Sequence, residues 1–194
     1  MTIPKGLSVS ADQIKKLREL TGAGVLDAKR TLEEHNGDFD KAVAVLKEKG
    51  LQAAAKKADR VARQGLIETY VHAGGKIGTM LELNCETDFV ARTPDFRELA
   101  HDLALQIAAT NPKFVSPDDI PGSVREEQQS IFAKAAAAEG KKPDLVEKIV
   151  QGKMENYYKE TCLLRQPFIR DENTMIHDLV QSKIVKLGEN IIVR

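Results

Sequence analysis

The sequence predicts an α+β protein in which helices outnumber strands. Only three Tyr and six Phe occur among the 194 residues, and there is no Trp, whereas Ala and Leu are common, which favours helices over an all-β sandwich. Apolar residues recur at helical spacing over most of the chain, but they alternate as in strands between residues 66 and 83. We expect a helical N-terminal module followed by a core of a small antiparallel sheet, helices and an antiparallel helical hairpin.

Three short helices are predicted within residues 1–50. Ser10, with Gln13 three residues later, forms the pattern of a capping box before the first apolar stripe. Asp38 is placed to cap the third helix, and Gly50 is expected to end it. A three-helix bundle of this size buries little surface and is marginally stable alone. We therefore expect this segment to act as a docking module.

Residues 51–64 are predicted to form a basic helical connector. Between Lys47 and Arg63 six cations accompany only two acidic residues, although the whole chain has no net charge. Such a stretch could contact phosphates, which makes an RNA-binding accessory protein of translation, using residues 47–63, the alternative function. No aromatic residue is interleaved to stack on a base. We interpret the cations as the solvated side of a helical connector.

The core domain is expected over residues 65–194. The alternating pattern on either side of Gly74-Gly75 predicts a β-hairpin, and a polar loop then leads to Thr93-Pro94, an N-cap and first residue for a long helix. Two helical patterns at about 123–161 predict a helical hairpin. The remaining expected elements are an edge strand or turn at 166–169, a helix at 175–187 and a strand at 190–194.

Several classes of protein are disfavoured by what the sequence lacks. The longest run without a charged residue, Leu103 to Pro112, has ten residues, against the ~18 to 20 needed to span a bilayer. Residues 1–7 show no secretory or transit peptide, so we expect a cytoplasmic protein. Cys85 and Cys162 stand in no pairing or zinc-binding motif, and we expect both to be reduced thiols.

No pattern typical of catalysis was found. The four histidines, at 35, 72, 101 and 177, are at least 29 residues apart, so no pair of them can hold a metal from one helix face. Gly74-Gly75-Lys76 lacks both the first glycine and the Ser or Thr of a phosphate-binding loop. A small-molecule enzyme would need a pocket with convergent ionisable groups, and nothing points to one. We expect a binding protein, not an enzyme, with no metal and no cofactor.

Two segments resemble the elongation factor Ts family: Ile14-Lys-Lys-Leu-Arg-Glu-Leu-Thr-Gly-Ala-Gly24 and Leu83-Asn-Cys-Glu-Thr-Asp-Phe-Val-Ala-Arg92. Further matches in the same order are Ala53-Ala-Ala-Lys-Lys-Ala58, Gln166-Pro-Phe168 and Leu187-Gly-Glu-Asn190. The resemblance covers almost the whole chain. It implies a guanine-nucleotide exchange factor that releases GDP from elongation factor Tu and binds no nucleotide itself.

The resemblance also implies that the N-terminal helices form a module similar to ubiquitin-associated domains, which docks on the nucleotide-binding domain of the partner. The positions that match this contact region are Leu17, Arg18, Thr21, Gly22, Ala23, Val25 and Leu26. Where the family usually reads Gly-Met-Met-Asp, this chain reads Gly24-Val25-Leu26-Asp27, an apolar change that should preserve packing. For Leu17 and Leu20, a place in the core of the bundle is an equal alternative.

By the same resemblance, nucleotide exchange depends on four consecutive residues, here called the exchange segment: Thr87, Asp88, Phe89 and Val90. In the family, the phenylalanine wedges between helices of the partner, so that the groups holding its magnesium shift. From the residues alone, Phe89 would instead pack on the helix that starts at Pro94. Gln106 stands where many relatives carry His, so we assign it no contact. Short relatives with one copy of the core work as homodimers, which predicts a homodimer here.

Overall fold

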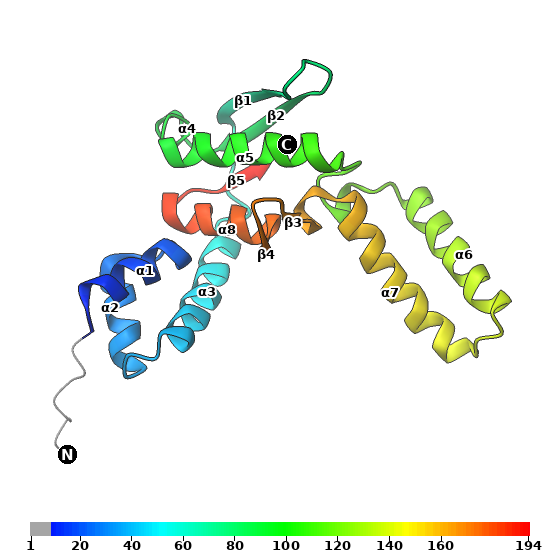
Figure 1. Cartoon of the computed structure of the whole chain (residues 1–194), viewed down its shortest axis with the longest axis horizontal. Coiled ribbons are helices and arrows are strands. Elements are labelled where there is room, and N and C mark those ends of the chain that lie inside the picture. The colour runs from blue at the N-terminus through cyan, green and yellow to red at the C-terminus, as the bar shows by residue number, and fades with distance from the viewer. Residues whose placement is uncertain (1–8) are drawn as a thin grey trace. The chain divides into compact units, whose positions relative to one another are not determined.

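The computed structural model describes residues 9–194, so residues 1–8 of the predicted docking module lie outside the described part (Figure 1). Helices combined with a small antiparallel sheet confirm the predicted α+β class. The helices are α1 (Ala11–Thr21), α2 (Val25–Glu34), α3 (Phe39–Ala55), α4 (Asp88–Ala91), α5 (Pro94–Thr110), α6 (Gly122–Ala138), α7 (Pro143–Thr161) and α8 (Ile176–Leu187). The strands are β1 (Gln64–Val71), β2 (Gly78–Cys85), β3 (Pro167–Phe168), β4 (Asp171–Met175) and β5 (Ile191–Val193).

Internal contacts divide the described chain into two compact units. The first unit contains the residues up to Glu68 together with Leu81–His101 and Asp178–Arg194, and the second contains Thr69–Met80 and Asp102–His177. The predicted domain boundaries at residues 50 and 64 stay predictions. No helix within residues 9–194 is both long enough and apolar enough to cross a bilayer.

The N-terminal helices of the first unit form as the sequence predicts. Ser10 Oγ accepts a hydrogen bond from the backbone N–H of Gln13 at 3.1 Å, and Gln13 Oε1 accepts one from the N–H of Ser10 at 3.0 Å. These two bonds are the predicted capping box, which satisfies donors that the first turn of α1 cannot use. The three helices share a buried apolar core made of Leu17, Ala28, Leu32, Ala42 and Leu46.

The prediction that Gly50 ends the third helix is wrong, because α3 continues to Ala55. Gly50 is buried, and a Cβ atom built on it would lie 3.3 Å from Val185 Cγ2 of α8. The glycine therefore lets α3 approach α8 closely within the first unit and does not stop the helix. Beyond Ala55 the chain makes turns up to β1, so the predicted helical connector 51–64 is helical only in its first part.

The three-stranded sheet has the order β1-β2-β5, with β5 antiparallel to β2. Leu83 of β2 pairs with Val193, and Cys85 pairs with Ile191. Both the hairpin and the final strand predicted from sequence are therefore confirmed, and pairing with β5 extends β2 through Cys85. The side chains of Leu81, Leu83 and Cys85 are buried.

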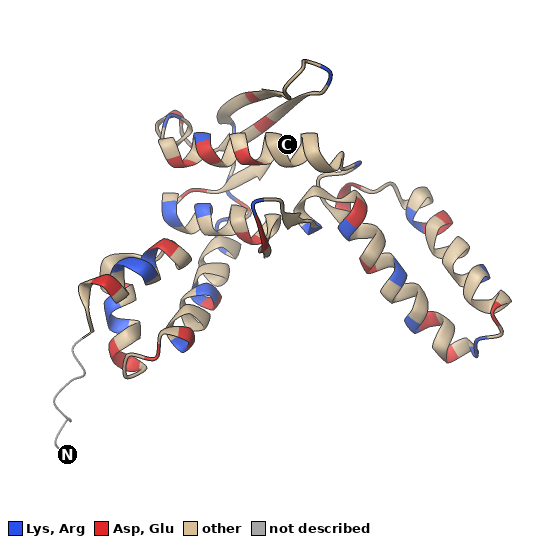
Figure 2. Cartoon of the chain, viewed as in Figure 1, with Lys and Arg blue, Asp and Glu red and all other residues tan. Residues whose placement is uncertain are grey.

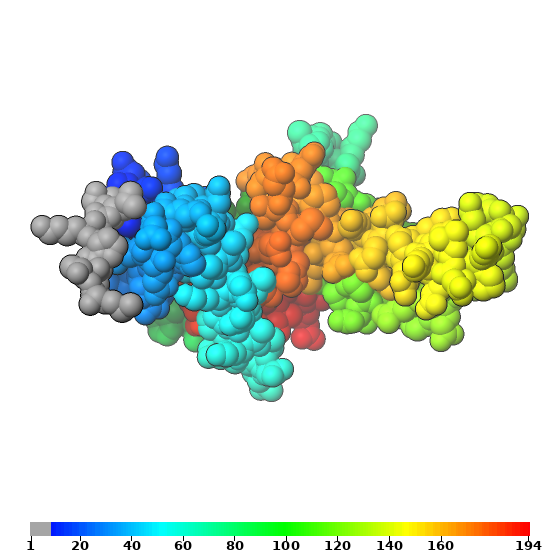
Figure 3. Space-filling model, turned by 90° about the horizontal axis from the view of Figure 1, so that it is seen from below, coloured from blue at the N-terminus to red at the C-terminus, as the bar shows by residue number. Residues whose placement is uncertain are grey.

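In the second unit, α6 and α7 pack side by side as the predicted helical hairpin (Figures 1 and 3). At the base of α7, β3 pairs with β4. Sequence analysis did not predict β4.

Gln106 of α5 is fully buried beside β3. Its Nε2 donates to Gln166 Oε1 at 3.2 Å and to the carbonyl of Pro167 at 3.1 Å, and its Oε1 accepts from the N–H of Ile169 at 2.9 Å. Both ends of this amide are used inside the chain, which agrees with assigning it no partner contact.

Candidate partner-binding site

Of the exchange segment, Thr87 is the N-cap and the other three residues lie on the single helical turn α4, whereas the sequence predicted a polar loop over residues 84–92. Asn84 and Cys85 belong to β2, and α4 begins at Asp88. The loop prediction is wrong for residues 84–85, which pair as strand, and for residues 88–91, which form a helical turn capped by Thr87. Thr87 caps α4 through its Oγ1, which accepts from the N–H of Val90 at 3.4 Å.

Phe89 extends from the first turn of α4 into solvent, with 78% of its surface exposed. The buried side of α4 is provided by Ala91. On α5, Phe96 and Leu99 are both fully buried, in contrast to Phe89. The packing of Phe89 on α5 that the residues alone suggest is therefore not what the structure has. A large apolar side chain in this position is available to a partner.

Thr87 differs from Phe89 because its polar groups are engaged inside the chain. Its N–H donates to Glu189 Oε2 at 3.0 Å, and its hydroxyl donates to Glu189 Oε1 at 2.6 Å. Its carbonyl accepts from the Cys85 thiol at 3.1 Å. Burial, together with the nearby Glu189 carboxylate, raises the pKa of the Cys85 thiol to about 11, so the thiol stays a hydrogen-bond donor at neutral pH. Thr87 is therefore placed to hold α4.

Asp88 and Val90 complete the exchange segment. Asp88 Oδ2 accepts from Arg92 Nη2 at 2.7 Å, an ion pair across one turn of helix at the surface. Val90 is half-buried. Of the four residues predicted from the family motif, the structure thus exposes Phe89 most and leaves the Asp88 carboxylate in reach of solvent, while Thr87 is turned inward.

The structure separates the predicted contact residues of the N-terminal module into two groups. Leu17 is fully buried and Thr21 nearly so, with the Thr21 hydroxyl donating to the carbonyl of Leu17 at 2.6 Å. Leu17 belongs to the apolar core of the bundle, so in the free chain these two side chains are turned inward, and their role as contacts stays a prediction. The exposed apolar residues around the α1–α2 turn are Leu20 at 57%, Val25 at 50% and Leu26 at 81%. We call these three residues the α1–α2 surface; Arg18 is also exposed beside it.

Gly22 and Ala23 form the turn between α1 and α2. Gly22 ends α1 in the left-handed conformation, with φ of +70°, and its N–H donates to the carbonyl of Arg18 at 2.8 Å. A Cβ built on Gly22 would lie 3.0 Å from the carbonyl oxygen of Ser182 in α8. The turn conformation and this close approach explain the glycine without any partner.

Gly22→Ala is expected to lower the free energy of unfolding by about 1 to 3 kcal/mol, since it adds backbone strain to crowding against α8. Gly37→Ala is the matched control, because Gly37 has φ of +78° but nothing within 4 Å of a built Cβ. Urea unfolding followed by circular dichroism measures both variants. An equal loss in the two would contradict the close approach of the turn to α8.

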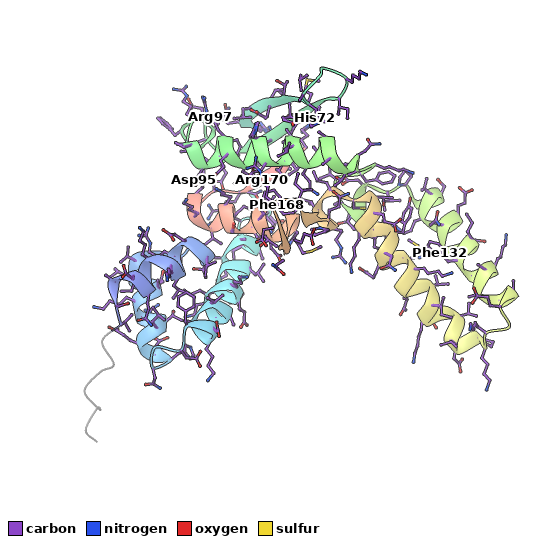
Figure 4. All side chains as sticks on the ribbon, in the orientation of Figure 1. His72, Asp95, Arg97, Phe132, Phe168 and Arg170 are labelled. Atoms are coloured by element: carbon purple, nitrogen blue, oxygen red, sulfur yellow. The ribbon has the colours of Figure 1, made fainter. Side chains whose placement is uncertain are left out.

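An ion-pair network joins α5 to α8 in the first unit; Figure 2 shows the charged residues on both helices, and Figure 4 labels Asp95. Asp95 Oδ1 accepts from Lys186 Nζ at 2.5 Å and from Lys183 Nζ at 3.2 Å, and Lys183 also donates to Glu98 Oε2 at 2.9 Å. The hydrogen bond from Lys186, together with Lys183, holds the pKa of Asp95 below its usual value. Burial alone would lower the pKa of Lys183, but the bonds to Glu98 and Asp95 outweigh it and raise that pKa.

Asp95→Asn is expected to reduce stability at pH 6 and to matter much less near pH 2. The folded-state pKa of Asp95 is lowered, so its contribution is present above the unfolded pKa of about 4 and is lost as pH falls through the folded value. Urea unfolding of both proteins between pH 2 and pH 6 measures the difference. A difference that stays constant over this range would contradict the ion-pair role of Asp95.

Two residues that support the site were given no role by sequence analysis. Glu189 binds the N–H of Glu86 at 3.1 Å in addition to its contacts with Thr87, and Asn190 is buried beside it. Both lie about a hundred positions from the segment that they contact. The only signal in the sequence is the family match at residues 187–190, which carries no information about what those residues touch.

Among residues 9–194, no group of three or more His, Cys, Asp or Glu side chains is placed to hold a metal ion. In the second unit, a groove of about 350 Å³ lies between α6 and α7 beside Phe132, which is labelled in Figure 4. It is lined by Gln128, Phe132, Lys153, Asn156, Tyr157 and Glu160. The lining contains no Ser, Cys or His that could serve as a nucleophile with its base.

Comparison with known proteins gives one consistent result. The family model described as Elongation factor TS matches residues 7–194. The chain is 50% identical over 186 residues to Elongation factor Ts of Carboxydothermus hydrogenoformans, covering 96% of this chain and 86% of that protein. It is 52% identical over 188 residues to Elongation factor Ts of Coprothermobacter proteolyticus, covering 97% and 95%. The chain therefore belongs to the elongation factor Ts family, a family of translation elongation factors.

Proposed function

We propose that this chain is a guanine-nucleotide exchange factor that speeds the release of GDP from elongation factor Tu during translation elongation. Membership of the elongation factor Ts family supports the partner and the process. The single structural observation that carries the proposal is Phe89, which is 78% exposed on a helical turn whose base is tied down by hydrogen bonds. An exposed aromatic side chain on a supported turn is suited to enter another protein.

In the proposed mechanism, Phe89 enters the partner near its nucleotide site and displaces the groups that hold magnesium. A bound magnesium ion is often the largest local charge at a phosphate site, so disturbing it weakens diphosphate binding more than losing one neutral hydrogen bond. Burying one Phe contributes roughly 1.5 to 3 kcal/mol, which corresponds to about one to two decades in rate or affinity. The chain and GDP then oppose each other's binding by the same factor.

The N-terminal module provides the second contact in this proposal. The α1–α2 surface, with Arg18 and Ala23 beside it, docks on the nucleotide-binding domain of the partner. Leu17, Thr21 and Gly22 act from within the module by shaping that surface. Leu20 is added to the predicted contact residues because it is exposed.

The chain exerts this effect without a catalytic residue, a cofactor or a nucleotide of its own. We place it in the cytoplasm, where translation elongation occurs.

RNA binding through residues 47–63 remains the alternative function. The end of α3 and the connector, cyan in Figure 3, lie at the surface, but one of the cations, Arg60, lies 3.5 Å from the Glu86 carboxylate of its own chain. No observation favours RNA over a protein partner.

The test is the release of fluorescently labelled GDP from elongation factor Tu, followed in a stopped-flow instrument with unlabelled GDP in excess. The release rate should rise with the concentration of this chain and then level off. RNA titrated at 150 mM salt serves as the comparison, because an RNA-binding protein would bind it with an affinity that falls steeply as salt increases. A release rate that does not change, together with salt-dependent RNA binding, would replace the proposal by its alternative.

We also propose that the chain forms a homodimer, as its resemblance to short members of the family predicts. Ile192 on the edge strand β5 is 41% exposed, and an apolar residue on a sheet edge is a common place for a second copy to pack. Light scattering at micromolar concentration should give twice the monomer mass of 21.4 kDa. A mass of 21.4 kDa with full exchange activity would contradict the dimer.

A further inference from the structure

The base of α4 is held by a carboxylate from the other end of the chain. Glu189 Oε2 accepts from the N–H of Glu86 at 3.1 Å and from that of Thr87 at 3.0 Å. Its Oε1 accepts from the Thr87 hydroxyl at 2.6 Å. Hydrogen bonds to an ionised acceptor are stronger than neutral ones. One side chain thus fixes both the backbone and the side chain of the residue that caps α4.

Glu189 is itself held in place from both sides. Gly188 ends α8 with φ of +79°, and the buried Asn190 follows. The N–H of Asn190 donates to Glu86 Oε1 at 2.7 Å. The side-chain amide of Asn190 donates to the carbonyl oxygens of Ala58 at 3.1 Å and Arg60 at 2.9 Å. The turn after α8 is therefore tied to the connector on one side and to the base of α4 on the other.

The direction of Phe89 depends on this anchor because α4 has little stability of its own. It has four residues, far fewer than a helix needs to persist without outside contacts. Phe89 is exposed and gains little from packing on its own chain. The capping residue Thr87 is two positions before Phe89, so a shift of Thr87 moves the aromatic ring with it.

We infer that Glu189 is a positioning residue for nucleotide exchange: its carboxylate holds Thr87, and thereby aims Phe89 at the partner. This inference rests on the proposed exchange function. It assigns Glu189 no contact with the partner, since its two oxygens are occupied within the chain. A side chain displaced by about 1 Å from its productive position can lower a rate roughly a hundredfold. Loss of Glu189 can therefore slow GDP release even though Phe89 is still present.

The first test compares Glu189→Ala with Glu189→Gln in labelled GDP release. Glu189→Ala should lower the maximal release rate by about tenfold or more, with little change in melting temperature. Glu189→Gln should recover most of the rate, since its amide oxygen can accept from both N–H groups while its nitrogen donates to the Thr87 hydroxyl. Glu98→Ala is the matched control, because it removes a carboxylate that binds only Lys183 among the contacts seen. A Glu189→Ala rate equal to that of Glu98→Ala would overturn the inference.

The second test asks whether Glu189 acts through Phe89. In a Phe89→Ala background, adding Glu189→Ala should slow release no further, because the ring that it positions is gone. Full additivity of the two changes would overturn the inference. If Glu189→Ala fails to fold, Thr87→Val takes its place, since it keeps the shape of the residue and removes the hydroxyl that both donates to Glu189 and caps α4. A wild-type release rate in Thr87→Val would likewise count against positioning.

A readout without the partner separates this inference from the proposed function. In Glu189→Ala, the amide hydrogens of Glu86 and Thr87 should exchange with solvent faster, while those of the buried strand β2 keep their protection. Unchanged protection of the two amides would overturn the positioning role whatever the exchange activity. Faster amide exchange in Glu189→Ala, combined with a wild-type chain that does not change the rate of GDP release, would refute the exchange function and leave the anchor by Glu189 supported.

Discussion

Phe89→Ala is expected to slow the stimulated release of GDP by about 10- to 100-fold, because the variant lacks the roughly 1.5 to 3 kcal/mol that burying this ring in the partner provides. The melting temperature should stay within about 1 to 2 °C of the wild-type value, since a side chain that is 78% exposed contributes little to the folded state. Stopped-flow release of labelled GDP and thermal unfolding of the free chain measure the two effects separately.

Phe89→Leu is the matched control, because leucine keeps much of the apolar area while losing the ring, and it should retain part of the activity. A large fall in the melting temperature of Phe89→Ala, with exchange activity that recovers in full at low temperature, would show that this residue supports the fold. It would then have no role as a wedge.

Phe96→Ala should have the opposite effect and destabilise the chain by about 3 to 5 kcal/mol. Phe96 is fully buried on α5, so its removal loses apolar burial and leaves a cavity. Exchange activity at low temperature should fall only in proportion to the fraction of chain that is unfolded. Urea unfolding of the variant measures the loss, and a change below about 1 kcal/mol would contradict the place of Phe96 in the core.

The elements that sequence analysis predicted well are those whose signals are local. The capping box at Ser10 and Gln13 formed because both of its bonds join residues three apart. The hairpin of α6 and α7 formed because each helix has its own apolar spacing and a turn lies between them. Strand β4 was missed because its sequence, Asp171-Glu-Asn-Thr-Met175, is polar and becomes a strand only by pairing with β3. Gly50 was wrongly predicted to end α3, because the glycine is needed where α3 packs closely on α8, a helix distant in sequence.

The candidate site was predictable only in part, and for a similar reason. The family motif singled out Phe89, but the residues alone suggested that this side chain packs on α5, whereas it is 78% exposed. The motif also grouped Thr87 with Phe89, although the former is turned toward Glu189. In the N-terminal module, resemblance could not separate the buried Leu17 from the exposed Leu26. Which of these side chains are buried and which are exposed depends on tertiary packing, and the local sequence pattern does not predict it.

The proposed exchange mechanism is tested most directly by measuring the release of labelled GDP from elongation factor Tu with and without this chain, in excess magnesium and again in excess EDTA. If Phe89 acts by displacing the groups that hold the metal, the chain should accelerate release strongly in magnesium. Most of that acceleration should disappear in EDTA, where the ion is already gone. A release rate in magnesium that stays the same at every concentration of the chain would contradict the exchange function itself.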